Sequence, residues 1–139
     1  QVLYSADSSS TGVRVMPITN GVPAAGAITS TGIGSPVSVR VHPGGNSLYL
    51  VHNTAGPNIV HLRIQSSGAL SQLGTYSASG TGPISMAIDA TGNFLLVTGT
   101  YGSVDVFRID ANGYLTLVST TTAGGSPRGI TLANYRDLP

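Results

Sequence analysis

The side chains in this chain that could act on a small molecule are a histidine, an aspartate and two arginines. His52 could serve as a general base on a water molecule, and Asp7 occupies the matching place in another part of the chain. Arginine binds carboxylates, phosphates or a developing oxyanion, which makes Arg128 and Arg40 candidates for that role. The neighbouring residues that could contact a ligand are Ser35, Asn53, Tyr101 and Ser126.

Each candidate also has a structural interpretation. A histidine in a polar loop can simply be exposed, and an arginine inside a strand can pair with an aspartate of a neighbouring strand. His42 and Asp89 occupy matching turns, where either side chain can bond the backbone two residues further on. Arg63 and Arg108 share one position in their repeats, which favours a solvated strand edge or a cross-strand pair.

The composition excludes several classes of function. The chain has no cysteine, and therefore no disulfide framework, thiolate zinc site or thiol nucleophile. Its three histidines are not spaced as metal ligands, and nucleotide-binding motifs are absent, so we expect neither a metal nor a cofactor. A net charge of +1 and the lack of a long apolar run argue against nucleic acid and membrane as partners.

The composition also indicates an all-β protein. Charged residues make up 8% of the chain, against about 25% in an ordinary soluble domain. Lysine and glutamate, the residues on which exposed helices depend, are both absent. Glycine contributes 19 residues and proline 8, as expected for many short strands joined by turns.

The elements that must position the candidates repeat along the chain. Pro36, Pro83 and Pro127 each follow a glycine by one or two residues and lie 47 and 44 residues apart. An alternating strand follows each proline, over 36–42, 83–89 and 127–133. A later strand in each unit ends in an isoleucine, and these isoleucines recur at nearly the same spacing: Ile18, Ile64 and Ile109.

Four short strands in a unit of 44 to 47 residues are typical of a β-propeller blade. We therefore predict one propeller segment over 1–139, with repeats at about 1–33, 34–80 and 81–124 and a closing strand at 125–139. In a propeller, the loops after the second and fourth strands of each blade share one face. That arrangement would gather on one rim Asp7, Ser35, His52, Asn53, Ser126 and Arg128.

Three four-stranded blades form an arc and cannot close a ring, because propellers have about four to eight blades. The strand predicted at 127–133 could complete a blade with the strands of residues 2–31. Two alternatives follow. The arc is half of a ring closed by a second copy, or a fragment of a six- or seven-bladed propeller whose other blades lie elsewhere.

Residues 36–53 read PVSVRVHPGGNSLYLVHN and resemble the blade motif of lactonase-type propellers. Residues 91–97 and 104–115 are similar to the same family, and related repeats occur in surface propellers of the YVTN type. The resemblance implies a seven-bladed propeller that hydrolyses 6-phosphogluconolactone or a related lactone, or an uncharacterised secreted or periplasmic relative. The motif is structural and transfers no catalytic residue, and the family's frequent acidic residue after Asn53 is replaced by Thr54.

We expect a non-catalytic scaffold or binding module of a secreted, periplasmic or cell-surface protein. Its partner would be a second copy or the missing blades, with a small lactone or sugar as ligand. The alternative is a lactone hydrolase, in which water attacks the ring carbonyl with His52 or Asp7 as base and Arg40 or Arg128 stabilising the oxyanion. A third possibility is a self-assembling subunit, since arc ends and strand edges invite pairing.

Overall fold

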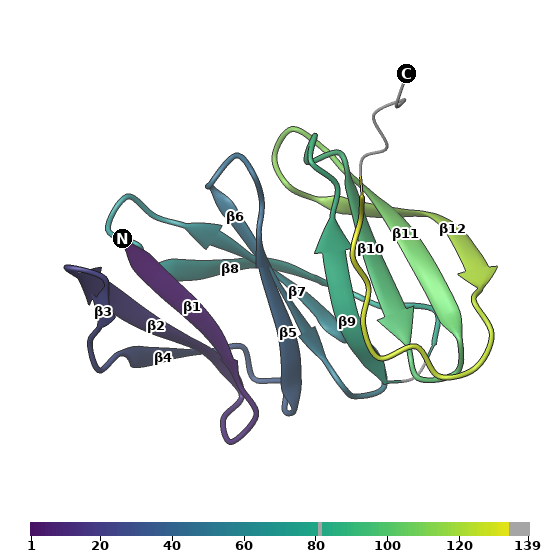
Figure 1. Cartoon of the computed structure of the whole chain (residues 1–139), viewed down its shortest axis with the longest axis horizontal. Coiled ribbons are helices and arrows are strands. Elements are labelled where there is room, and N and C mark those ends of the chain that lie inside the picture. Colours follow the sequence, from purple (N-terminus) through teal and green to yellow (C-terminus); the bar gives the residue numbers. More distant parts are fainter. Residues whose placement is uncertain (81, 134–139) are drawn as a thin grey trace.

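The computed structural model describes residues 1–80 and 82–133. The described residues form twelve strands and no helix, arranged as three antiparallel sheets that stand side by side as blades (Figure 1). The first sheet contains β1 (Val2–Asp7), β2 (Gly12–Thr19), β3 (Val22–Pro23) and β4 (Ala27–Ser30). The second contains β5 (Pro36–Val41), β6 (Ser47–His52), β7 (Ile59–Ile64) and β8 (Leu70–Tyr76). The third contains β9 (Pro83–Ile88), β10 (Phe94–Gly99), β11 (Ser103–Ile109) and β12 (Leu115–Thr122).

The strand order confirms the predicted blade. In the second and third sheets the strands follow the chain from the inner edge outwards, β5-β6-β7-β8 and β9-β10-β11-β12. The first sheet begins at the second position of a blade: β1 pairs with β2, and β3 and β4 share the other side of β2. The inner strand β5 lies next to β1 on one side and β9 on the other. The three blades therefore form an arc around one inner surface.

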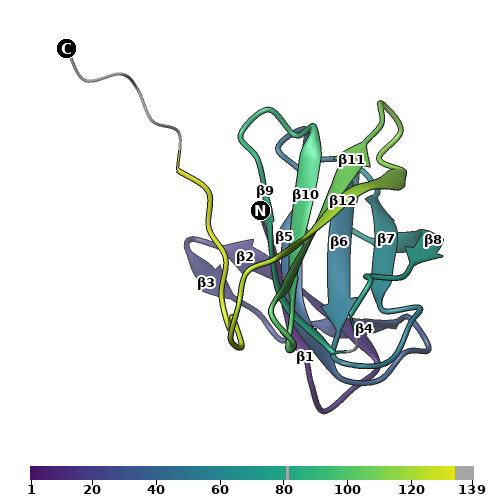
Figure 2. The same ribbon diagram turned by 90° about the vertical axis from the view of Figure 1, so that its right-hand side faces the viewer.

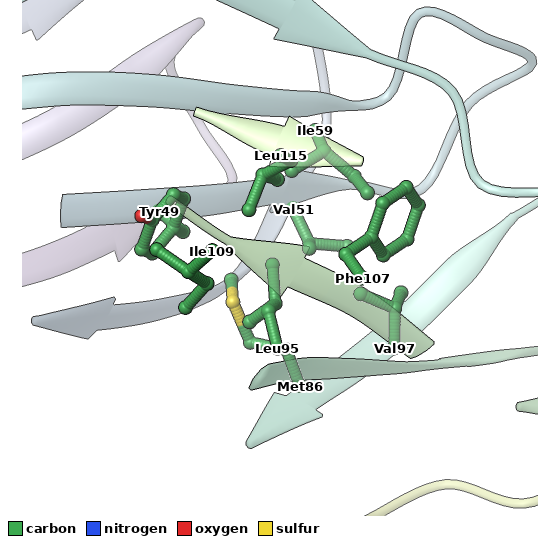
Figure 3. Packing of buried hydrophobic residues seen from close by; sticks show 9 residues of the cluster. All are labelled: Tyr49, Val51, Ile59, Met86, Leu95, Val97, Phe107, Ile109 and Leu115. Atoms are coloured by element: carbon green, nitrogen blue, oxygen red, sulfur yellow. The ribbon is translucent and has the colours of Figure 1, made fainter. Parts of the chain in front are cut away.

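Two apolar clusters hold the blades together. Strand β6 is buried along its whole length, because alternate residues face the blades on either side. Leu48 and Leu50 join the cluster shared with the first blade, which also contains Val13. Tyr49 and Val51 join the cluster shared with the third blade (Figure 3). This double burial explains why the sequence of β6 is almost continuously apolar.

The fourth inner strand, predicted over residues 127–133, does not form. Residues 123–133 follow β12 without strand structure and run beside β9 before leaving the sheets (Figure 2). An inner strand pairs with the second-position strand that follows it in its own blade, as β5 pairs with β6 and β9 with β10. No second-position strand follows 127–133 among the described residues. The last residues of the predicted closing strand, 134–139, lie outside the described residues.

Candidate functional site

Two adjoining hollows lie on the inner surface and its rim. The rim hollow, of about 500 Å³, is walled by the loops that follow β6 and β10 and by the segment after β12. The inner hollow, of about 560 Å³, lies over β1, β5 and β9. The two share Ile84 and Arg128, so a ligand could extend from one into the other.

Backbone hydrogen bonds hold the walls of the rim hollow. The N–H of Gly82 donates to the Thr54 carbonyl over 3.4 Å, and the Gly82 carbonyl accepts from the N–H of Thr100 at 3.2 Å. A further bond joins the segment after β12 to the loop after β10, from the N–H of Ala123 to the Gly102 carbonyl. These bonds fix the loops after β6 and β10 and the segment after β12 in one place.

The structure brings four of the predicted site residues together in the rim hollow. Asn53, Ser126 and Arg128 line it, as expected from loops that share one face, and so does the separate candidate Tyr101. Thr54 lies beside them, and its buried Oγ1 has no hydrogen-bond partner among the described residues. Because this hydroxyl has almost no exposed surface, a ligand in the hollow does not reach it.

The two arginines are positioned to bind an anion or a polarised oxygen. Arg40 is exposed on β5 and lines the inner hollow, where its Nη1 donates to the Val39 carbonyl at 2.8 Å. Arg128 is also exposed and lines both hollows. Within residues 1–80 and 82–133, neither arginine forms an ion pair, which leaves both guanidinium groups with unused donors. The structural interpretation of Arg40, a pairing with an aspartate, is not found in this part of the chain.

His52 lies outside both hollows. It is the last residue of β6 and is fully buried, so the picture of an exposed loop histidine is wrong. Its Nδ1 bonds the Gly34 carbonyl at 3.0 Å, and its Nε2 lies 3.3 Å from Thr31 Oγ1. Burial lowers the pKa of the imidazole. His52 ties the end of the first blade to the second and is not accessible as a base.

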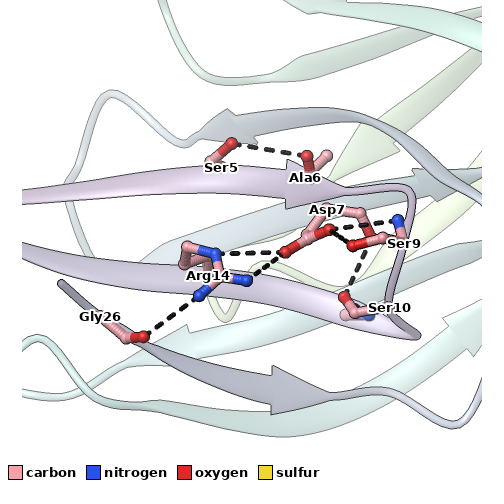
Figure 4. Close-up of polar contacts among 8 residues, drawn as sticks. Ser5, Ala6, Asp7, Ser9, Ser10, Arg14 and Gly26 are labelled. Carbon is pink, nitrogen blue, oxygen red and sulfur yellow. Dashed lines mark hydrogen bonds and ion pairs between the residues drawn. The ribbon is translucent and has the colours of Figure 1, made fainter.

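The carboxylate of Asp7 is bonded within a local polar network (Figure 4). Its carboxylate accepts bonds from the hydroxyl and the N–H of Ser9 and from Arg14, whose Nη2 lies 2.5 Å away. The Ser9 hydroxyl and the Arg14 guanidinium hold the pKa of Asp7 below its usual value. Arg14 also reaches the Gly26 carbonyl, so the network joins β1, β2 and the chain just before β4. A carboxylate held in this way is a poor proton acceptor.

The remaining predicted ligand contact, Ser35, contributes to the rim only through its backbone. Its carbonyl accepts the N–H of Asn53 at 2.8 Å, which fixes the start of the loop that carries Asn53. The Ser35 backbone has a φ of 55°, so the chain turns sharply just before β5. Ser35 therefore positions a neighbour of the hollow and does not line it.

The other acidic and imidazole groups in the described residues have structural partners. His42 closes its turn, accepting the N–H of Gly44, and its Nε2 bonds the Gly92 carbonyl of the next blade at 2.9 Å. Asp89 and Asp110 accept backbone N–H groups of their own turns. The matching turn roles of His42 and Asp89 are as predicted.

Sequence reasoning missed the polar bonds between blades. The Tyr49 hydroxyl of the second blade donates to the Gly113 carbonyl of the third blade at 2.7 Å. Asp105, buried in β11, accepts the N–H and hydroxyl of Ser79 from the preceding blade. The only signal for the first bond was the recurrence of tyrosine at positions 4 and 49.

Neither hollow contains a described histidine or aspartate. The arrangement offers hydrogen-bond donors and cations to a ligand but no side chain suited to remove a proton from water. Over the residues that are described, no three metal-binding side chains cluster, and no helix is able to cross a membrane.

Three blades around a common inner surface, with polar loops gathered on one rim, define a segment of a β-propeller. The chain belongs to the lactonase family of seven-bladed β-propellers, whose family model matches residues 3–134. No curated protein sequence matches the chain.

Solved propeller structures resemble the chain closely in fold. A candidate 6-phosphogluconolactonase of Bacteroides fragilis superposes with a TM-score of 0.81 at 18% identity, over 94% of this chain and 38% of its own length. Another from Bacteroides uniformis has the same TM-score and identity, over 96% and 41%. The periplasmic gluconolactonase of Pseudomonas aeruginosa has a TM-score of 0.68 at 21% identity, over 85% and 35%. The chain thus spans about two fifths of the length of the Bacteroides structures and about a third of the Pseudomonas one.

Proposed function

We propose that the chain forms a substrate-binding segment of a lactone-hydrolysing propeller. The observation that carries this proposal is that Arg40 and Arg128 line the two adjoining hollows and form no ion pair within the described residues. Membership of the lactonase family supports it, as do relatives that are named for 6-phosphogluconolactone and gluconolactone. A lactone of this kind presents a ring carbonyl, several hydroxyl groups and, when phosphorylated, a dianion.

The polar groups of the rim suit those features of a lactone. The guanidinium of Arg128 can donate to the ring carbonyl and stabilise the oxyanion that forms when water adds to the carbonyl carbon. Asn53 and Ser126 can bond the sugar hydroxyls. Arg40, on the adjoining hollow, can hold an anionic substituent. The ring carbon–oxygen bond then breaks, and the ring oxygen takes up a proton to give the hydroxy acid.

In this proposal the group that takes the proton from water lies outside the described residues. His52 and Asp7, the candidates from the sequence, are bonded within the blades and do not line either hollow. The same observation favours the second candidate function, a module that binds a lactone or sugar without converting it. The two functions share the binding role of the arginines and differ only in turnover.

Binding and turnover of gluconolactone and its 6-phosphate test the proposal directly. Binding is measured by calorimetry at a pH where spontaneous hydrolysis is slow, and turnover by titration of the acid released. Arg128→Ala should weaken binding by about tenfold or more, since a charge-assisted bond contributes about 1.5–3 kcal/mol. Arg63→Ala, an exposed arginine on β7 outside both hollows, is the matched control.

Binding that requires Arg128 supports the proposed site under either function. Hydrolysis above the spontaneous rate would in addition support the hydrolase over the non-catalytic module. An absence of binding overturns the proposed site, and so does an equal loss of affinity in Arg128→Ala and Arg63→Ala.

The proposed location is extracytoplasmic, either periplasmic, secreted or at the cell surface. The support is the Pseudomonas aeruginosa relative, which is named as periplasmic, together with the lack of cysteine and lysine in this chain. Fractionation of the source cells followed by detection of the protein with an antibody tests this location, and recovery only from the cytoplasm would contradict it.

A further inference from the structure

His61 occupies a position at which the other two blades have valine. Three residues before the repeated isoleucine, the first blade has Val15 in β2, the third has Val106 in β11 and the second has His61 in β7. The register of the strands agrees, since Val15 pairs with Tyr4 and His61 pairs with Tyr49. One joint between blades therefore contains a titratable ring where the equivalent position has an aliphatic side chain.

The ring of His61 is fully buried, and only one of its nitrogens has a hydrogen-bond partner. Its Nε2 lies 3.0 Å from Ser47 Oγ, and the ring stacks on Tyr49 with the two centroids 5.0 Å apart. Its Nδ1 has no hydrogen-bond partner among the described residues. A protonated imidazole donates from both nitrogens, so the charged ring would leave a buried N–H unsatisfied. The closed joint therefore favours the neutral ring.

The charged groups around His61 do not offset this cost. Burial is the main cause that lowers the pKa of His61, and Arg63 on the same strand and His42 in the turn before β6 lower it further. Asp110, which follows β11 in the third blade, acts in the opposite direction. The other titratable groups packed here are tyrosines, which stay neutral in mild acid: Tyr49, Tyr76 and Tyr114.

The turn between β11 and β12 covers His61 from the side of the third blade. A Cβ atom at Gly113 of this turn would lie 2.7 Å from His61 Nε2, so the backbone of the turn is in direct contact with the ring. The Gly113 carbonyl accepts the Tyr49 hydroxyl at 2.7 Å, and the ring of Tyr114 stands edge-on to His61 at 5.7 Å. Movement of this turn away from the second blade would bring water to the imidazole.

We propose that proton uptake by His61 separates the turn between β11 and β12 from the second blade and breaks the bond from Tyr49 to Gly113. The separation is local, because β6 and β7 keep their pairing in one sheet and β11 and β12 keep theirs in the other. Both sheets contain all four strands of a blade, and the proposal does not depend on lactone binding.

The direction of the pH dependence follows from the two environments of the ring. In the open joint the ring is in water and has its ordinary pKa of 6.5, whereas in the closed joint burial lowers the pKa. The open joint therefore binds more protons in mild acid. The joint stays closed above about pH 6.5 and opens as the pH falls toward the lowered pKa of the closed state.

Nuclear magnetic resonance can follow two equivalent joints in one sample. Overhauser contacts between the ring of Tyr49 and the Hα protons of Gly113 report on the joint that contains His61. Contacts between Tyr4 and Gly68, whose hydroxyl and carbonyl are 2.8 Å apart, report on the matching joint that has Val15. Lowering the pH from about 8 to about 5 should remove the first contact and leave the second. The ring signals of His61 should titrate with the same midpoint as the loss of the first contact.

Two substitutions separate His61 from the other imidazole of this joint. His61→Val introduces the residue that the other two blades have, and this variant should keep the contact between Tyr49 and Gly113 in acid. His42 bonds the Gly92 carbonyl of the third blade through its Nε2 at 2.9 Å. His42→Asn retains a side chain suited to the turn and should lose the contact at the same pH as the parent.

Loss of the contact in the parent and in His42→Asn, with its retention in His61→Val, supports the proposal. Survival of the contact in the parent after the His61 ring has titrated overturns it, as does loss of the contact in His61→Val or loss of both joints together. If His61→Val did not fold, the two midpoints in the parent would decide, because a ring that titrates at a different pH does not control the contact.

Discussion

Two tyrosine hydroxyls make the same bond between successive blades. Tyr4 donates to the Gly68 carbonyl at 2.8 Å, and Tyr49 donates to the Gly113 carbonyl at 2.7 Å. Donor and acceptor are 64 residues apart in both cases. Each tyrosine thus fastens the second-position strand of its blade to the outer hairpin of the next, and its ring packs in the apolar cluster between them.

Removal of one hydroxyl should measure what this bond contributes. Tyr49→Phe leaves the ring in place but deprives the Gly113 carbonyl of its donor within a buried site. We expect the free energy of unfolding to fall by about 1–3 kcal/mol, the cost of a buried group left without its partner. Tyr101→Phe, at a residue that is 80% exposed, is the control and should unfold like the parent in urea. An equal effect of the two substitutions would contradict this account.

The two fully buried histidines should make the protein sensitive to mild acid. Burial is the main cause that lowers the pKa of both His52 and His61 from the ordinary value of 6.5. The unfolded chain therefore binds more protons than the folded chain below that value. Stability is fully present above about pH 6.5 and is lost as the pH falls toward the lowered pKa values of the folded state.

Urea unfolding between pH 8 and pH 5 measures this loss. His61→Phe keeps an aromatic ring against Tyr49, on which His61 stacks at 5.0 Å, but cannot be protonated. Its unfolding free energy should depend less steeply on pH in this range than that of the parent. If the two slopes were the same, His61 would not be a source of the acid sensitivity.

At the scale of elements, the outer hairpin of the third blade depends on a glycine for two separate reasons. Gly113 has a φ of 88°, which disfavours any other residue. A Cβ atom there would also lie 2.6 Å from Ser47 Oγ and 2.7 Å from His61 Nε2 of the second blade. The hairpin therefore sits against its neighbour at a distance that only glycine permits.

A comparison of two alanine substitutions can separate the two reasons. Gly21 has a similar φ of 78° in the hairpin of the first blade, but a Cβ there would meet nothing within 4 Å. Gly21→Ala should cost about 1–2 kcal/mol from backbone strain alone. Gly113→Ala should cost about 1–3 kcal/mol more, because the neighbouring blade must shift. If thermal unfolding showed the same loss of stability for both variants, the contact between Gly113 and the second blade would be loose.

The sequence predicted the elements well because their signals are local. The prolines at 36 and 83 begin β5 and β9, and the continuous apolar run at 48–51 lies in the doubly buried β6. The prediction that loops share one face also placed Asn53, Ser126 and Arg128 together.

Other features could not be predicted from local patterns, because they depend on the position of the next blade. Whether His52 faced a loop or the interior was decided by Thr31 and Gly34 of the first blade. Asp105 found its partner at Ser79, 26 residues away. The strand predicted at 127–133 does not form for the same reason, since its sequence is suitable but no second-position strand lies beside it among the described residues.

At the scale of the whole molecule, the two joints between successive blades hold the arc together. Each joint is formed by an apolar cluster and by a tyrosine hydroxyl that bonds a carbonyl of the next blade. Only 8% of the residues are charged, so the joints depend little on ion pairs. Because salt screens charges and leaves apolar contacts in place, calorimetry in low and in high salt should give nearly the same melting temperature. A large fall of the melting temperature in high salt would mean that charged groups hold the blades together.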